Sequence, residues 1–313
     1  MKVNLTHRLS YDYTSPVQLG EHRLCLRPRS HGYQRLLHHH LEVHPGPQRS
    51  LPMLAAGNDE VLKLWFAGQT EHFMLEAVST VVTQLPPPLD LCIDGEVAPL
   101  PYRPGDLDAE LHANLRGWLA NGQHDPAVVE LAQESLLGSE GQCLLFFDML
   151  HRQIQERVNY TERHHGTAWP AGRTLRERLG SCRDLAVLMI EACRCVGLPA
   201  RFTSGYHLAD DRRGAYDLHA WCEVYVPGAG WRGFDPSCGC PVDDRYVVLA
   251  ASADPTLTAA VQGSFSGAPG VTSHMVWSIE ADITAEGDSS RMAGLCTDRD
   301  GCSDELQEAS SAI

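Results

Sequence analysis

Lysine is almost absent from this chain: Lys2 and Lys63 are its only lysines among 25 basic residues, so the protein offers few primary amines of its own. The basic residues are outnumbered by 40 acidic ones, which gives a formal net charge of −15. A chain of this charge has no basic excess with which to displace counterions from phosphate groups. We therefore expect no nucleic-acid partner.

Long apolar runs are missing as well. Residues 1–20 lack the continuous apolar segment of a secretory signal, and no later stretch stays apolar long enough to cross a bilayer. The 11 cysteines are scattered, without the dense spacing of a secreted disulfide scaffold. We expect a cytoplasmic protein with reduced thiols and no membrane partner.

The composition that remains, 43% hydrophobic and 21% charged over 313 residues, is that of a globular protein of about two domains. Short β-like runs between turn signals predict an N-terminal β-sandwich or barrel-like domain over residues 1–100. Residues 101–140 are predicted as a linker and helical connection, and residues 141–284 as the core domain. Residues 285–313, rich in Ser, Asp, Glu and Gly, are predicted to be a disordered tail.

Within the core, apolar spacing predicts helices over residues 125–138 and 141–157, and a third helix from Cys182 to the stop signals Gly197 and Pro199. Thr174 and Glu177 have the spacing of a capping box. Strands are predicted over 200–207, 219–226 and 231–235, with a turn at 227–230. The fold class is α+β, with one long helix followed by an antiparallel sheet.

Cys182 stands at the start of the predicted helix that runs to Gly197 and Pro199. The unpaired N–H groups and the positive dipole end of a helix favour a thiolate, and they can also hold an oxyanion. Ser181 is the expected N-cap, with Asp184 completing the cap. The alternative is that Cys182 is a small buried apolar residue in line with Ala186 and Met189.

His219 begins the strand HAWCEVYV and is the candidate base, because a thiolate nucleophile needs a nearby imidazole. Alternation along the strand puts it on one face with Trp221, Glu223 and Tyr225. The alternative is a structural or solvent-facing histidine at a strand end.

Asp235, on the following strand, is the candidate carboxylate that would orient the imidazole. Pairing across a tight four-residue turn would set Val226 against Trp231 and bring His219 nearer to Cys238 than to Asp235. A bulge at a glycine of this hairpin would correct the register. An aspartate before a proline is also a common turn starter, so Asp235 has a purely local alternative role.

Two segments, GSCRDLAVLMIEACRCVGLPARFTSGYHL and DLHAWCEVYVPGAGWRGFDPSCG, resemble the transglutaminase-like core family in its bacterial branch. The cysteine of G-x-C-x-D, the histidine of HAW-x-E-V-Y and the aspartate of GW-x-x-x-DP are the catalytic positions of that family, and they fall on Cys182, His219 and Asp235. The β-rich leader is similar, more weakly, to the bacterial N-terminal region of the family. Many relatives carry glutamine after the nucleophile, where this chain has Arg183.

The resemblance implies a papain-like core in which the helix of the cysteine packs on the antiparallel sheet that bears the histidine and aspartate. It implies cysteine-dependent acyl transfer on amide bonds of a protein or peptide substrate through a thioester, without a cofactor or metal. We expect hydrolysis or deamidation somewhat more than transamidation, because a cytoplasmic cross-linker would meet many accidental amine acceptors. Four aromatic residues are expected to line the substrate groove, although such residues often belong to a core: Trp221, Tyr206, Tyr160 and Trp169.

Three other interpretations remain open. A zinc site would use Cys238 and Cys240 with Cys222 and His219, but a one-residue spacing is not that of paired zinc knuckles. A calcium site would use the acidic doublets at 210–211 and 243–244, which lack the spacing of an EF-hand. A non-catalytic binding or scaffold module of the same fold is the third, and the complete triad argues against it. The sequence does not indicate an oligomeric state.

Overall fold

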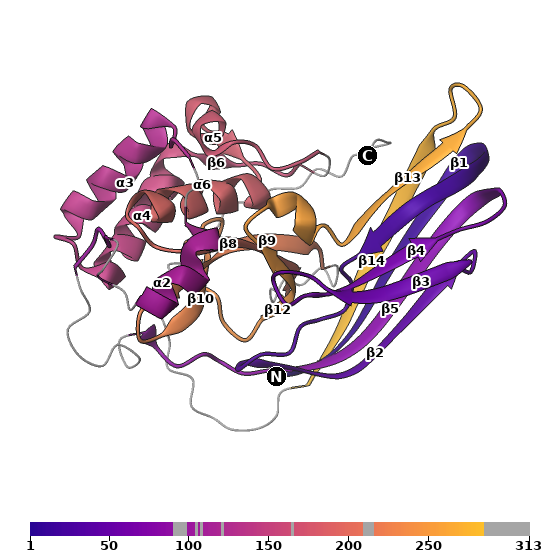
Figure 1. Cartoon of the computed structure of the whole chain (residues 1–313), viewed down its shortest axis with the longest axis horizontal. Coiled ribbons are helices and arrows are strands. Elements are labelled where there is room, and N and C mark those ends of the chain that lie inside the picture. Colours follow the sequence, from indigo (N-terminus) through magenta and orange to yellow (C-terminus); the bar gives the residue numbers. More distant parts are fainter. Residues whose placement is uncertain are drawn as a thin grey trace.

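The computed structural model describes residues 1–89, 99–103, 106, 109–119, 122–163, 166–208 and 216–284. These residues form a seven-stranded and a five-stranded sheet, and the long helices gather on the side of the smaller sheet that lies away from the larger one (Figure 1). None of the helices in these ranges is long and apolar enough to cross a bilayer. The predicted tail, 285–313, lies outside the described residues.

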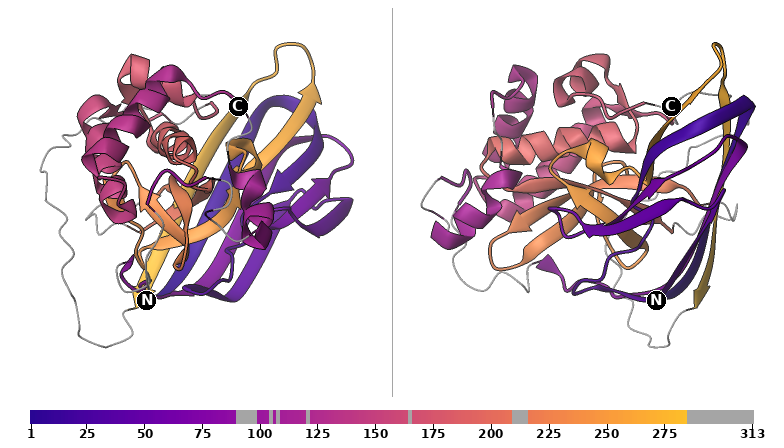
Figure 2. Two further views of the ribbon diagram at one scale, coloured as in Figure 1. Left: turned by 60° about the vertical axis from the view of Figure 1, so that its left-hand side comes forward. Right: turned by 45° about the vertical axis from the view of Figure 1, so that its right-hand side comes forward.

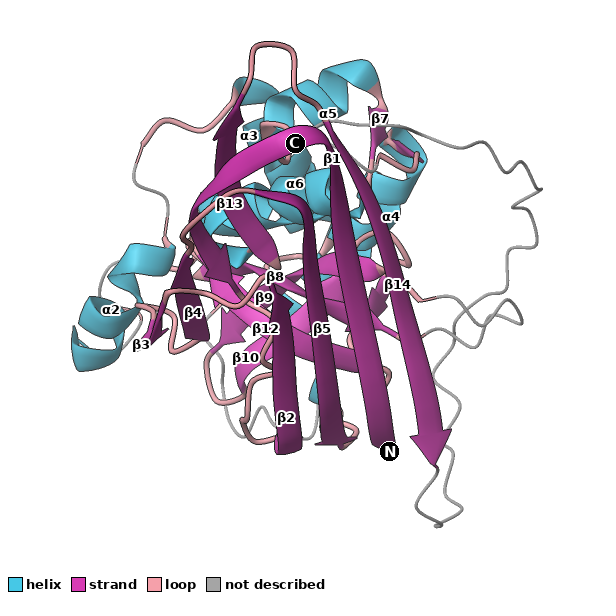
Figure 3. Cartoon of the chain, turned by 90° about the vertical axis from the view of Figure 1, so that its right-hand side faces the viewer, coloured by secondary structure: helices cyan, strands magenta, loops and turns pink. Residues whose placement is uncertain are grey.

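The larger sheet is built around one long strand, β1, which alternates buried and half-exposed or exposed residues along most of its length. Its first half pairs with β5 on one side and β14 on the other, and its second half pairs with β13 and β4. The sheet curls strongly, and β2, β5, β1 and β14 run side by side (Figures 2 and 3). Its strands are β1 (Lys2–Leu24), β2 (Gln34–His44), β3 (Arg49–Leu54), β4 (Glu60–Trp65), β5 (Thr70–Thr83), β13 (Val261–Gly267) and β14 (Ser273–Thr284).

The last two strands of the described chain complete this N-terminal sheet. Residues up to 284 were expected to belong to the core, but β13 and β14 pair with β1 instead. In the register of β14, Trp277 lies opposite Leu9 and Ala281 lies opposite Leu5, so apolar side chains of both strands share one face. This matching, between residues far apart in the chain, places the C-terminal strands in the first sheet.

The smaller sheet is antiparallel, in the order β11-β10-β9-β8-β12, and α6 packs against β9 and β8. Residues of α6 such as Leu188 and Met189 share a buried cluster with Cys222 and Val224 of β9. This is the expected α+β arrangement, with the helix that starts at Cys182 packed on the sheet. The α-helices, and the strands outside the larger sheet, have the following bounds: α2 (Ala109–Leu115), α3 (Pro126–Gly138), α4 (Cys143–Arg157), β6 (Asn159–Tyr160), α5 (Ala171–Glu177), β7 (Leu179–Gly180), α6 (Cys182–Cys195), β8 (Ala200–His207), β9 (Leu218–Val226), β10 (Gly230–Asp235), β11 (Cys240–Pro241) and β12 (Tyr246–Ser252).

The predicted capping box at Thr174 is wrong. Thr174 lies inside α5, fully buried, and the helix begins three residues earlier at Ala171, after Pro170. Pro170 occupies the N-cap position, and this helix start has no side-chain cap hydrogen bond. The Ser/Thr-x-x-Glu pattern therefore fell in a helix interior.

The two sheets are joined by a buried apolar contact. Val3 and Leu5 of β1 share a cluster with Tyr206 of β8 and with Val247 and Leu249 of β12. These side chains are almost completely shielded from solvent, so one face of the larger sheet packs directly against the smaller sheet.

Candidate active site

Cys182 is the first residue of α6, and the cap predicted for this helix is present. Ser181 has an extended backbone, and its N–H and hydroxyl both donate to Asp184 Oδ2, at 2.9 and 2.8 Å. The Cys182 side chain is half-buried at the edge of the core cluster. A thiol is thus placed at the helix end where backbone N–H groups lack intrahelical partners.

Asp184 ties the start of α6 to the segment before α5. Its Oδ1 accepts hydrogen bonds from the Trp169 N–H at 2.7 Å and from Arg163 Nη2 at 2.6 Å. Burial alone would raise the pKa of Asp184, but the hydrogen bonds from Trp169, Ser181 and Arg163 outweigh it and hold that pKa below its ordinary value. The carboxylate therefore stays ionised and fixes the helix start in place.

Arg183, the residue that follows Cys182, binds the same segment. Its guanidinium donates to the carbonyl oxygens of Arg163 and Gly166, at 2.7 and 2.5 Å. The side chain that follows Cys182 thus holds the neighbouring loop.

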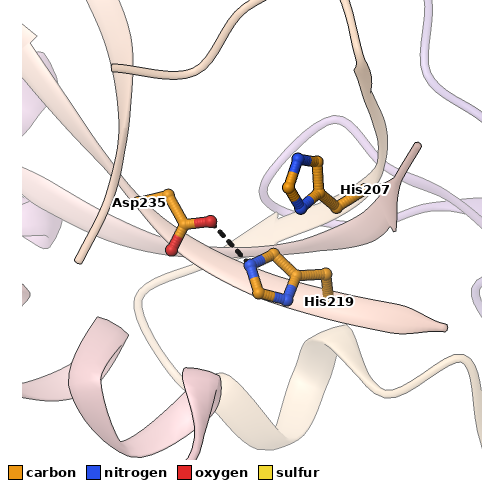
Figure 4. Close-up of side chains that lie close together, drawn as sticks. All are labelled: His207, His219 and Asp235. Carbon is orange, nitrogen blue, oxygen red and sulfur yellow. Dashed lines mark hydrogen bonds and ion pairs between the residues drawn. The ribbon is translucent and has the colours of Figure 1, made fainter. Parts of the chain in front are cut away.

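His219 and Asp235 meet directly: His219 Nε2 lies 2.7 Å from Asp235 Oδ2 (Figure 4). The predicted pairing of Val226 with Trp231 is wrong by one residue, because Gly230 belongs to β10 and pairs with Val226. The ladder then runs without a register shift to Phe234, opposite Cys222. Asp235 follows on the face of His219, which reaches it diagonally across the strands.

The Asp235 carboxylate is completely buried and saturated with donors. Oδ2 also accepts from the Tyr246 hydroxyl at 2.8 Å, while Oδ1 accepts from the Ser237 N–H at 2.9 Å and from its hydroxyl at 2.5 Å. Burial would raise the pKa of Asp235, but the hydrogen bonds from His219, Ser237 and Tyr246 hold that pKa far below its ordinary value. Tyr246 and Ser237 were not predicted.

Cys182 completes the arrangement. Burial opposes protonation of His219, but its hydrogen bonds with Asp235 and with the Cys182 thiol outweigh burial and raise the pKa of His219 to about 10. With Nε2 engaged by Asp235, Nδ1 is the ring nitrogen that remains for the thiol. The structure thus brings the three predicted residues into one hydrogen-bonded chain.

A second histidine, His207, lies beside this chain and was not anticipated. Its ring stacks on Tyr246 with centroids 4.2 Å apart and lies 5.3 Å from the ring of His219. Burial, followed by the neighbouring His219, lowers the pKa of His207 to about 4. One ligand atom each from His207, His219 and Asp235 lies within 4.8 Å of the others (Figure 4). In the described ranges this is the one group of three or more residues with such metal-ligand spacing.

The four predicted groove residues divide into two pairs. Trp221 is fully buried against the Tyr246 ring, and Tyr206 is buried between the sheets, where its hydroxyl lies 3.0 Å from His7 Nδ1. Their expected role in a groove is therefore wrong, because β12 and β1 cover them. Tyr160 is half-exposed beside Gly180, and the guanidinium groups of Arg163 and Arg173 both lie over the ring of Trp169.

The four residues weighed for zinc do not come together as one ligand set. Cys222 is buried on the helix side of β9 and hydrogen-bonds with Cys193, whereas Cys238 hydrogen-bonds with Cys240 and lies beside Asp235 and His219. Asp243 forms an ion pair with Arg245. The doublet at 210–211 lies outside the described residues.

Two family models match the chain. The model of the transglutaminase-like superfamily covers residues 135–236, and that of the bacterial transglutaminase-like N-terminal region covers residues 3–82. An uncharacterized protein of Mycobacterium tuberculosis is 31% identical over 270 residues, which cover 81% of this chain and 84% of the relative. The chain belongs to the transglutaminase-like superfamily. An equally similar uncharacterized protein of Mycobacterium bovis is also 31% identical.

The transglutaminase-like fold is also found in a solved protein of Cytophaga hutchinsonii that is proposed to be a cysteine protease. It superposes with a TM-score of 0.62 at 20% identity and covers 92% of both chains. The superposition thus includes the curled sheet as well as the transglutaminase-like core. Cys182, His219 and Asp235 all lie within the range matched by the core model.

Proposed function

We propose that this protein catalyses cysteine-dependent acyl transfer on amide bonds of a protein or peptide. Cys182 is the nucleophile, His219 the general acid and base, and Asp235 the residue that orients the imidazole. The observation that carries the proposal is the hydrogen-bonded chain from Asp235 through His219 to Cys182 at the N-terminus of α6.

The electrostatics of the chain suit this chemistry. With its pKa near 10, His219 is an imidazolium at neutral pH, stabilised by the ionised Asp235 carboxylate. Cysteine attacks as a thiolate, and an adjacent imidazolium stabilises that form. Asp235 holds the imidazolium ring in the orientation that faces Cys182.

In the first step, the Cys182 sulfur attacks the carbonyl carbon of the amide and the carbonyl oxygen becomes an oxyanion. Backbone N–H groups of the first turn of α6 stabilise that charge. His219 donates its proton to the amide nitrogen, the C–N bond breaks, and ammonia or an amine leaves a thioester on Cys182. In the second step, neutral His219 takes a proton from the acceptor, which attacks the thioester and releases the thiolate.

The acceptor decides the activity. Water gives peptide hydrolysis or deamidation, and a primary amine gives transamidation. We propose water as the main acceptor, on the argument that many amines would compete unproductively for an exposed thioester in the cytoplasm. The cytoplasmic location is itself a proposal, consistent with the free thiols of the described cysteines.

The experiment is mass spectrometry of a glutamine-containing peptide library incubated with the protein and a primary amine. It compares the unmodified chain with Cys182→Ala and with Cys195→Ala, a matched thiol at the other end of the same helix. We expect products from the unmodified chain and from Cys195→Ala, and none from Cys182→Ala. Cleavage, or the mass increase of about one dalton that deamidation gives when water replaces ammonia, would identify water as acceptor, and amine adducts would identify transamidation. Identical products from Cys182→Ala would refute the proposal and favour a non-catalytic binding module.

A further inference from the structure

We propose that His207, His219 and Asp235 form a binding site for a divalent transition-metal ion of the zinc type, and that the bound ion switches off acyl transfer. The existence of the site does not depend on the proposed function. Its inhibitory effect does, because the ion would occupy the proposed catalytic base.

The ligand set and its spacing fit such an ion. Two imidazoles and one carboxylate are a common three-residue zinc set that leaves one coordination position for water. Bonds of about 2.0–2.1 Å in a tetrahedral site place neighbouring ligand atoms about 3.3 Å apart. The three ligand atoms already lie within 4.8 Å of one another, and His219 and Asp235 are 2.7 Å apart. Small side-chain rotations would bring all three to bonding distance.

His207 is the residue whose surroundings call for a further partner. Its Nε2 is buried, and the described residues give it no hydrogen-bond partner. A buried polar nitrogen without a partner is unfavourable. Coordination to a metal ion would give the His207 ring the partner that it lacks.

The groups around the three residues orient them as ligands. The Ser237 N–H and hydroxyl hold Asp235 Oδ1, so that Oδ2 faces the histidines. Tyr246 stacks on His207 and also donates its hydroxyl to Oδ2. Outer partners of this kind fix the rotamers of metal ligands and strengthen metal binding. One tyrosine thus positions two of the three proposed ligands.

A bound ion would stop catalysis for a simple reason. The nitrogen of His219 that now bonds Asp235 would be committed to the metal, and its proton would pass to solvent as the ion binds. The ring could then neither pair with the carboxylate nor donate that proton to the leaving amine. The inhibition should be reversible, because no covalent bond of the protein changes and a chelator removes the ion.

Metal binding is measured first, on the full chain carrying Cys182→Ala so that the nucleophilic thiol cannot act as a ligand. Equilibrium dialysis against Zn²⁺ or Co²⁺ is combined with the absorption spectrum of the cobalt form. We expect one tight equivalent whose spectrum lacks a sulfur-to-cobalt charge-transfer band. Adding His207→Gln should weaken it by at least about 10–100-fold, the loss seen when ligand support is removed.

The control adds His38→Gln, which removes an exposed histidine on β2, and it should leave the tight equivalent unchanged. Equal affinity with and without His207 would overturn the proposal and assign binding to surface histidines. A sulfur charge-transfer band that disappears in Cys238→Ser would overturn it in favour of a thiolate site. Should His207→Gln fail to fold, X-ray absorption of the zinc form decides: two imidazoles and oxygen support the site, and sulfur refutes it.

The inhibitory part is tested on the chain with Cys182 intact. Zn²⁺ should abolish acyl transfer, a chelator should restore it, and the concentration for half inhibition should rise at least about 10-fold in His207→Gln. Activity that persists with one tight equivalent bound would overturn the switch. If the metal-free protein shows no acyl transfer at all, the proposed function fails, and the dialysis result still decides whether the metal site exists.

Discussion

Replacing Asp235 by asparagine tests the electrostatic core of the site through protein stability. The substitution keeps the shape of the side chain and removes the charge that faces His219 at 2.7 Å. Breaking a buried, hydrogen-bonded charge pair costs about 3–5 kcal/mol. We therefore expect Asp235→Asn to lower the free energy of unfolding by about that amount near pH 6, where both partners are charged.

The pH dependence of this loss is the sharper test. The folded pKa of His219, about 10, lies above its unfolded value of 6.5, so its stabilisation is complete below about pH 6.5 and is lost as pH rises toward about 10. The free-energy difference between the unmodified chain and Asp235→Asn should shrink across this window by up to about 1.4 kcal/mol per pH unit. It should also shrink in acid, as the carboxylate, whose folded pKa is depressed, becomes protonated.

Urea denaturation of both chains at several pH values measures this difference. Glu134→Gln is the matched control, because it removes one carboxylate from a largely exposed pair with Arg157. It should change stability by less than about 1 kcal/mol at every pH. A difference for Asp235→Asn that stays constant between about pH 6.5 and 10 would refute the imidazolium assignment of His219.

Three further outcomes are expected. Asp184→Ala should lower the free energy of unfolding by about 3–5 kcal/mol in urea denaturation, because it leaves the donors around a fully buried carboxylate unpaired; a loss below about 1 kcal/mol would contradict this role. Trp221→Ala should lower the free energy of unfolding by about 3–5 kcal/mol, whereas Tyr160→Ala should lower it by less than about 1 kcal/mol and should raise KM instead; the reverse order of stability losses would contradict the burial of Trp221. Cys182 should be alkylated faster than Cys195 at neutral pH, measured by peptide mass spectrometry, and equal rates would count against a nucleophilic thiol.

The parts of the core with local signals were predictable from the sequence. The helices predicted over 125–138 and 141–157 correspond to α3 and α4, and Cys182 does begin α6, because apolar spacing and caps are local properties. The strands β8, β9 and β10 were placed to within a residue for the same reason. The hairpin register was missed by one position, since Gly230 was counted in the turn, and a single residue decides which side chains face each other.

Contacts between distant segments could not be predicted in this way. Tyr246 reaches Asp235 only because β12 pairs with β8, and that pairing places Tyr246 opposite His207. No spacing in the sequence relates these residues. Trp221 is buried because Tyr246 and Val248 of β12 pack against it. Alternation along β9 predicted which face Trp221 is on, but not that β12 would cover that face. The catalytic candidates were therefore readable from their motifs, while their supporting residues depend on strand order.

The pairing of β14 with β1 has a consequence for the order in which the chain can fold. Lys2 leaves the ribosome well before its partner Thr284, which follows only after the whole core has been made. Until then one edge of β1 carries unpaired backbone groups, which is the kind of edge that recruits foreign strands. Contacts of such high sequence separation also slow folding. We therefore expect chains that end before residue 261 to aggregate rather than to yield a separate, folded catalytic domain.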